Sequence, residues 1–265
     1  MATLLLLTAA LTLSAAPSAP PEVRLEQLVA ELATLADNQQ RILAASASLL
    51  GAPYVNDPLG EGEGQPDADP LLRLDAMDCQ TYVETVLAMA ASASHDEVEK
   101  RLNDLRYDGE VSFGRRHHYF EAQWLPANER KGYVRDVTRT LFADAARTHT
   151  KVVTPAQWKS RPRSTHFELP EDRAPIGELK LAYVPLQVFL ERAREIPSGS
   201  IFAVVREDRP NVPHMVTHMG FVVHQGKSTF VRHAGRSRYQ KVVDEPLASF
   251  VKRHAAYGRW RVLGV

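Results

Sequence analysis

The pattern of apolar residues changes once along the chain, and this change limits the folds that the sequence can form. In the first half, apolar residues recur every three or four positions, over 23–50 and again after Asp78, as in amphipathic helices. Near the C-terminus four β-rich runs are separated by Gly, Pro or Asn: 200–207, 216–225, 228–234 and 257–265. Helices followed by strands predict an α+β domain in which the N-terminal helices pack on a C-terminal antiparallel sheet.

Between these two parts the pattern is weaker. We expect a helix over 133–147, an irregular, proline-containing connection over 150–175, and an amphipathic helix over 184–196 that Pro197 ends. The short segment "HQGKS" predicts a hairpin between the second and third strand runs. No repeat and no linker clearly divides the chain, so we expect a single domain over residues 20–265.

The N-terminus has the features of an export signal. From Leu4 to Leu13 the chain is apolar except for two threonines, and small residues follow over 14–19. Because a membrane-spanning helix needs about 20 apolar residues, we expect a signal peptide over residues 1–19 and no transmembrane segment in the mature chain. The protein is therefore predicted to be exported to the periplasm or cell envelope. A net charge of zero gives no reason to expect nucleic-acid binding.

Cys79 is the only cysteine in the 265 residues, and it stands where a helix is expected to begin. Asp75 or Asp78 can cap that helix, which would place Cys79 in the first turn. Backbone N–H groups and the helix dipole favour a thiolate there and lower the pKa of the thiol. A nucleophilic cysteine is one interpretation; on composition alone, an inert buried cysteine is an equally good one.

Two histidines occupy neighbouring strands of the predicted sheet. Alternation places His218 on one strand face with Val216, Gly220 and Val222, and a hairpin would bring His233 beside it. A lone histidine on a strand is more often structural than catalytic. A pair beside a cysteine at a helix start favours a base and its orienting group only modestly.

Four short motifs occur in a fixed order: "LGAPYV", "MDCQTYVE", "THMGFVV" and "VRHA". Together they resemble the NlpC/P60 superfamily of papain-like cell-wall peptidases and amidases. More narrowly, the chain from about residue 50 onward resembles the DUF1460 branch, the N-acetylmuramoyl-L-alanine amidase-like proteins. That branch has a D-C-x-T-x-V-E helix start, here residues 78–84, and an R-x-H-Y element followed by Trp. The resemblance implies a papain-like fold with the nucleophile helix packed on the sheet.

The resemblance also implies roles for matching residues. Cys79 would be the nucleophile, His218 the general base and His233 the third, orienting residue. Tyr54 would lie near the oxyanion and help to stabilise it. The positions expected to bind substrate are Arg116, His118, Tyr119, Trp124 and Asn128. For this region, a solvated basic loop and packing of Trp124 in the core are alternative interpretations.

The implied function is an exported cysteine amidase that hydrolyses peptidoglycan muropeptides at the N-acetylmuramoyl–L-alanine bond, without a metal or other cofactor. One alternative is the same chemistry on the γ-D-glutamyl–diamino-acid bond of the stem peptide. Another is a zinc hydrolase that uses His214, His218, His233 and Glu84, although no H-E-x-x-H spacing is present. A third is a non-catalytic envelope-binding protein that keeps the fold.

Overall fold

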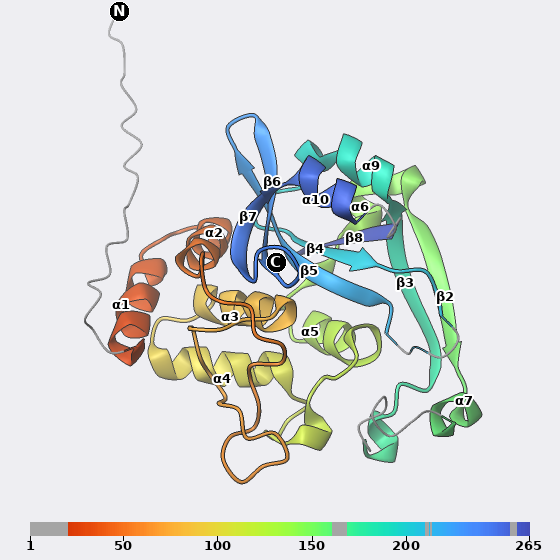
Figure 1. The fold of residues 1–265 in the computed structure, drawn as a ribbon, viewed down its shortest axis with the longest axis horizontal. Helices are drawn as coiled ribbons and strands as arrows, with labels where there is room; N and C mark the ends of the chain where they lie inside the picture. The colour runs from red at the N-terminus through yellow and green to blue at the C-terminus, as the bar shows by residue number, and fades with distance from the viewer. Residues whose placement is uncertain (1–20, 161–168, 210–211, 213, 255–258) are drawn as a thin grey trace, which may run out of the picture.

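The computed structural model describes residues 21–160, 169–209, 212, 214–254 and 259–265 (Figure 1). The predicted signal peptide over residues 1–19 lies outside the described residues. No helix of the described part is long and apolar enough to cross a membrane.

Four helices form the layer on one face of the sheet (Figure 1): α1 (Pro21–Ala33), α2 (Asn38–Ser48), α3 (Cys79–Ala90) and α4 (His95–Arg106). Side chains of Asp37, Asp78 and Ser94 cap α2, α3 and α4 by accepting hydrogen bonds from backbone N–H groups of the first turns. Every residue of α3 from Thr81 to Ala90 is buried. This helix is therefore the centre of the helical layer, and the others cover it.

The described strands form one antiparallel sheet in the order β2-β3-β8-β4-β5-β6-β7, with β1 paired to β8. Their bounds are β1 (Arg135–Asp136), β2 (Arg147–Val153), β3 (Gly177–Pro185), β4 (Ile201–Val205), β5 (Val216–Gln225), β6 (Ser228–Gly235), β7 (Lys241–Pro246) and β8 (Arg259–Gly264). The expected hairpin joins β5 to β6, and Gly226 in its turn has a φ of +57°, which glycine adopts without strain. The α+β prediction with an antiparallel sheet is confirmed.

Short helices cover the opposite face of the sheet: α6 (Thr138–Phe142), α9 (Leu186–Glu191) and α10 (Leu247–Arg253) (Figure 1). Strand β5 contributes to both cores, as its alternation predicts. Met219, Phe221 and Val223 pack with α1–α4, whereas Val222 packs with Phe250 and Trp260 on the other face. The remaining helices, α5 (Leu125–Arg130) and α7 (Pro155–Lys159), and a π-helical turn (Phe120–Trp124) lie in the connections.

The middle of the chain differs from expectation. Residues 133–147 hold the five-residue helix α6 and a 3-10 turn (Ala143–Ala145) besides β1 and the start of β2. Strand β2 and helix α7 occupy the beginning of the expected irregular region, and β3 replaces the start of the 184–196 helix. Strand β7 was not predicted. In β2 the buried side includes Lys151 while Val152 is exposed, and in β3 the exposed Glu178 and Lys180 alternate with apolar residues, so neither segment has a strong hydrophobic strand pattern. Pro185 then ends β3 and begins α9, which is shorter than predicted.

Candidate active site

Helix α3 begins at Cys79 because the residues around it form a capping box. The Asp78 carboxylate accepts hydrogen bonds from the backbone N–H groups of Gln80 (3.0 Å) and Thr81 (2.8 Å). The Thr81 hydroxyl in turn accepts one from the backbone N–H of Asp78 (2.9 Å). The D-C-x-T spacing thus has a structural explanation: Asp and Thr fix the helix start, and Cys79 between them becomes its first residue.

Cys79 lines a cavity of about 180 Å³ together with Tyr54, His218 and His233. We call this the Cys79 cavity. Tyr54 is held by its backbone, because its N–H donates to the Gln240 carbonyl (2.8 Å) and its segment pairs with Met77 just before α3. The structure therefore brings together all four residues that were expected to take part in catalysis, from the loop before α3, from α3, and from β5 and β6.

Behind the cysteine, polar side chains form a chain of contacts. His218 Nε2 lies 2.9 Å from His233 Nδ1, and His233 Nε2 lies 3.2 Å from a carboxylate oxygen of Glu245 on β7. Arg253 of α10 donates from Nε to the other oxygen of Glu245 at 2.9 Å. Glu245 and Arg253 were missed by sequence reasoning. Glu245 belongs to an unpredicted strand, and a charged pair near the C-terminus carries no motif of its own.

Gly220 creates the space for the two histidines to meet. It lies opposite His233 in the β5–β6 pairing, next to the registered pair of Phe221 and Arg232. A Cβ at Gly220 would lie 2.5 Å from the Arg232 carbonyl oxygen and 2.8 Å from the His233 Cβ, both too close. A side chain here would separate β5 from β6 at the point where the His218–His233 contact forms.

The electrostatics of the cavity differ from the expected lowered thiol pKa. Burial, followed by the negative charge of Asp78, raises the pKa of Cys79 to about 12, although hydrogen bonds from the backbone N–H groups of Met219, Cys79 and Gln80 oppose the change. Burial also lowers the pKa of His218 well below its ordinary value. Both changes favour the uncharged forms, a thiol at Cys79 and an imidazole at His218, in the cavity that the two residues line.

Tyr54 and the rim of the cavity supply donors and positive charge. Burial, followed by the charge that Cys79 and Asp78 would carry, raises the pKa of Tyr54 to about 12, so its hydroxyl keeps its proton at neutral pH. Arg236 and Arg238, in the turn between β6 and β7, are exposed and line the cavity, and no carboxylate is among the described residues that line it. The cavity therefore suits an uncharged reacting bond with an anionic group nearby.

The residues expected to bind substrate lie mostly in the interior. Trp124 and Asn128 have no exposed surface; the Trp124 indole donates to Glu84 at 2.8 Å, and the Asn128 amide donates to the Leu105 and Trp124 carbonyls. Tyr119 is buried against Trp158. Their placement favours a structural role and does not support substrate contacts for these three residues.

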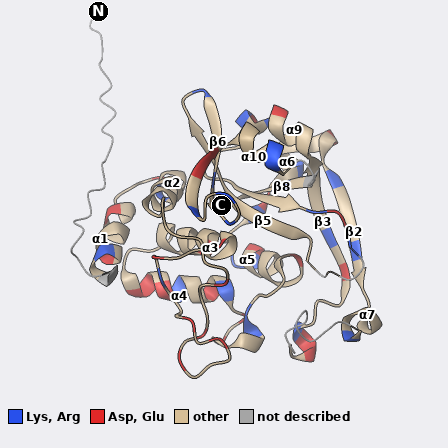
Figure 2. Ribbon diagram, viewed as in Figure 1, with Lys and Arg blue, Asp and Glu red and all other residues tan. Residues whose placement is uncertain are grey.

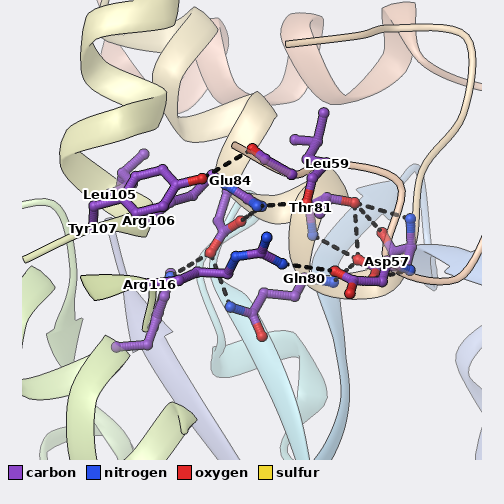
Figure 3. A network of polar contacts seen from close by, with 12 residues as sticks. Asp57, Leu59, Gln80, Thr81, Glu84, Leu105, Arg106, Tyr107 and Arg116 are labelled. Atoms are coloured by element: carbon purple, nitrogen blue, oxygen red, sulfur yellow. Dashed lines mark hydrogen bonds and ion pairs between the residues drawn. The ribbon is translucent and has the colours of Figure 1, made fainter. Parts of the chain in front are cut away.

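Glu84 is the centre of a closed polar cluster on α3 (Figure 3). Its carboxylate pairs with Arg106 at 3.1 Å and accepts hydrogen bonds from Gln80 (2.9 Å) and Trp124. Arg106 also donates to the Leu59 carbonyl at 2.9 Å. We call Glu84, Gln80, Arg106 and Trp124 the Glu84 cluster. The charges of Glu84 and Arg106 pair with each other, and both oxygens of the Glu84 carboxylate accept hydrogen bonds within the cluster, so neither oxygen is free to bind zinc.

Arg116 binds the acidic loop that precedes α3, which Figure 2 shows as a group of acidic residues below α4. Its guanidinium contacts Glu61 and Asp67 at 2.7 Å each and Asp57 at 3.3 Å. His118 Nε2 donates to the Phe113 carbonyl (2.7 Å), and Arg116 and His118 line a second cavity of about 250 Å³. Arg116 thus has carboxylate partners within the protein.

Among the described residues, no group of three or more His, Cys, Asp or Glu side chains is arranged to hold a metal ion. His214 is exposed just before β5 and is not among the residues that line the Cys79 cavity. Of the four residues suggested for a zinc site, His218 and His233 are in contact, whereas His214 and Glu84 do not line their cavity in the part of the chain that the structure describes.

An α+β domain that places a thiol, two imidazoles and a phenol around one cavity has the groups that hydrolases use for nucleophilic catalysis. The chain belongs to the AmiA-like family, described as N-acetylmuramoyl-L-alanine amidase-like, whose profile matches residues 44–257. The DUF1460 branch of the expected resemblance is thereby supported. The family suggests a hydrolase that acts on peptidoglycan.

Solved structures agree with this family. A DUF1460 protein from Legionella pneumophila has 23% identity and a TM-score of 0.78, with 91% of this chain and 93% of that one covered. Two structures of an N-acetylmuramoyl-L-alanine amidase from Bacteroides uniformis have 25% identity and TM-scores of 0.66 and 0.67. They cover 85% of this chain and 98% and 97% of theirs. Among curated proteins, none matches the sequence.

Proposed function

We propose that the protein is an exported cysteine amidase that hydrolyses the N-acetylmuramoyl–L-alanine bond of peptidoglycan fragments. The observation that carries the proposal is the Cys79 cavity, where a cysteine at the start of a buried helix meets a histidine pair backed by a carboxylate. The family description supports the bond. The proposal includes a papain-like NlpC/P60 architecture, a signal peptide over residues 1–19 and action outside the cytoplasm, where peptidoglycan lies.

The proposed mechanism begins with a neutral pair. Because His218 Nε2 contacts His233, Nδ1 is the nitrogen left to take the Cys79 proton as the sulfur attacks the amide carbonyl. The backbone N–H of Cys79 and the Tyr54 hydroxyl stabilise the oxyanion. His218 then gives its proton to the leaving amine of L-alanine, which leaves a muramoyl thioester on Cys79. Water, deprotonated by His218, hydrolyses the thioester and restores the thiol.

Charge on the cavity rim suggests how the substrate lies. Arg236 and Arg238 line the cavity, whereas a stem peptide carries free carboxylates and the muramoyl sugar carries none near the scissile bond. Arginine binds carboxylates with paired hydrogen bonds. We therefore place the peptide over the β6–β7 turn and the sugar on the other side of Cys79, toward the start of α3. No metal takes part in this scheme.

The test is mass spectrometry of muropeptides after incubation with purified protein in reductant, with wild type and Cys79→Ala compared. Release of the sugar and of a peptide that begins with L-alanine, by wild type only, would support the amidase. Cleavage after the γ-D-glutamyl unit would show that the scissile bond is the γ-D-glutamyl–diamino-acid bond, and the proposed cysteine mechanism would still apply. If neither protein cleaves any muropeptide, with EDTA or with added zinc, the enzyme proposal fails and a non-catalytic envelope-binding protein is the better account.

A further inference from the structure

Glu245 is a buried carboxylate that the mechanism above does not use. Its side chain has 0% exposure and lies behind His233, on the side away from His218. Burying a carboxylate costs several kcal/mol unless hydrogen bonds and an opposite charge compensate it. Both are present, because Arg253 pairs with it and His233 contacts it at 3.2 Å. Three elements, β6, β7 and α10, thus contribute side chains to this arrangement.

The charge on Glu245 decides where the proton of His233 lies. Burial raises the pKa of Glu245, but hydrogen bonds from His233 and Arg253 outweigh burial and lower it to about 2. An ionised carboxylate only accepts hydrogen bonds. The His233 nitrogen that faces it, Nε2, must therefore carry the hydrogen. In the neutral ring the other nitrogen, Nδ1, is then an acceptor.

The same reasoning extends to His218. Because Nδ1 of His233 accepts, the His218 nitrogen that faces it, Nε2, must donate across the 2.9 Å contact. The Nδ1 of a neutral His218 then has a lone pair. We propose that Glu245 is a positioning residue that sets the tautomers of both histidines, so that His218 Nδ1 is the base for Cys79. This inference rests on the proposed roles of Cys79 and His218.

The surroundings of His218 favour the neutral ring that this argument needs. Aromatic rings of Phe202, Phe250 and His254 lie 6.2, 5.8 and 6.1 Å from its centroid. Burial lowers the pKa of His218, the positive charge of Arg253 lowers it further, and the negative charge of Glu245 opposes this change. A charged imidazolium would be disfavoured there, and a neutral one must choose between two tautomers.

The first experiment observes the tautomers directly. Long-range ¹H–¹⁵N NMR of the full chain labelled in histidine distinguishes protonated from unprotonated ring nitrogens without substrate. We expect His218 and His233 both to carry their hydrogen on Nε2 in the wild type. A His218 protonated on Nδ1, or a His233 protonated on both nitrogens near neutral pH, would overturn the inference without any variant.

The second experiment compares Glu245→Gln with Asp244→Asn. Asp244 is the neighbouring acid on β7 and pairs with Arg232 at 2.7 Å, outside the Cys79 cavity. Its variant removes the same charge and is the matched control. We expect Glu245→Gln to mix the tautomers of His233 and to lower kcat about 10- to 100-fold with little change in KM, as for partners behind metal-bound histidines. Asp244→Asn should leave the tautomers and kcat unchanged.

Glu245→Asp keeps the carboxylate and tests the inference if the glutamine variant does not fold. It should preserve the tautomers and recover part of kcat. If a folded Glu245→Gln variant has unchanged tautomers and an unchanged kcat, Glu245 has only a structural role and the inference is wrong. If the tautomers behave as expected but no muropeptide is cleaved by wild type, the proposed function fails while the positioning role of Glu245 stands.

Discussion

Two polar clusters begin on the same helix and differ in how their polar groups are paired. The Cys79 cavity opens at the first residue of α3, and Glu84 lies five residues further on, almost fully buried. In the Glu84 cluster the opposite charges of Glu84 and Arg106 pair with each other, although both residues also line the second cavity. In the Cys79 cavity the polar chain ends at His218, which lines the cavity together with the Cys79 thiol. The pairing of charges, more than polarity or a nearby cavity, thus separates a structural cluster from a candidate reaction site.

The comparison explains why the motif D-C-x-T-x-V-E mixes two kinds of residue. Asp78, Cys79 and Thr81 build and occupy the helix start, whereas Glu84 points into the interior and joins α3 to α4 through Arg106. The R-x-H-Y element and Trp124 likewise hold loops to this interior. Mutations should therefore separate the two clusters, with loss of reaction in one and loss of stability in the other.

The largest effect is expected from Cys79→Ala. Without the thiol no acyl-enzyme can form, so we expect kcat for muropeptide cleavage to fall at least about 10,000-fold. The thermal midpoint should change little, because the capping box does not use the cysteine side chain. Differential scanning fluorimetry and steady-state kinetics on the same preparation measure both. Residual activity near the wild-type level would remove Cys79 from the mechanism.

Glu84→Gln should have the reverse effect. It leaves the Arg106 charge, which is almost fully buried, without its carboxylate, and such losses cost about 3–5 kcal/mol in the free energy of unfolding. Urea denaturation followed by tryptophan fluorescence would measure this change. For the fraction that stays folded at low temperature we expect kcat near the wild-type value. A stable but inactive variant would contradict the division between the two clusters.

Alkylation of the lone cysteine tests the neutral thiol. With the pKa of Cys79 raised to about 12, the thiolate fraction, and hence the rate with iodoacetamide, should rise about tenfold for each pH unit between 6 and 9. Urea-unfolded protein is the control, since its thiol has an ordinary pKa near 8.5. Intact-mass spectrometry follows the reaction. A fast rate that does not depend on pH would indicate a thiolate–imidazolium pair instead.

A smaller effect is expected from replacing the rim arginines, Arg236→Gln with Arg238→Gln. If they hold stem-peptide carboxylates, KM should rise about tenfold with kcat and stability unchanged. A substrate whose stem carboxylates are amidated should bind equally to wild type and to this variant. Arg194→Gln, which changes an exposed arginine outside the cavity, is the matched control. An equal rise in KM for both substrates would mean that the two arginines act through the overall positive charge of the rim and not by binding stem-peptide carboxylates.

Much of the fold could be predicted because the local signals were strong. Caps at Asp78 and Ser94 and regular apolar spacing predict α3 and α4, and alternation predicts β5 and β6. Strands β2 and β3 were missed because the buried side of β2 includes Lys151, the outer positions of β3 carry Glu178 and Lys180, and β3 pairs with the distant strand β8. Such long-range pairing leaves no local pattern for a reader of the sequence.

The cavity was predictable in part. A helix-start cysteine and two histidines on paired strands pointed to one place, and the structure brings them to the same cavity. The sequence could not show that burial and Asp78 would raise the thiol pKa, because local reasoning counts the helix dipole and omits desolvation. Nor could it distinguish Trp124 and Asn128 as interior residues, since their burial depends on how distant segments pack.

The Asp78 side chain has three separate structural and electrostatic roles. It caps α3, it accepts the backbone N–H of Asp57 at 3.1 Å and so anchors the loop that follows Tyr54, and its charge disfavours the thiolate next to it. Mutational tolerance should therefore be very low at this position. A protein engineer who wished to make the thiol more reactive would find that fold and reactivity are adjusted by the same carboxylate, in opposite directions.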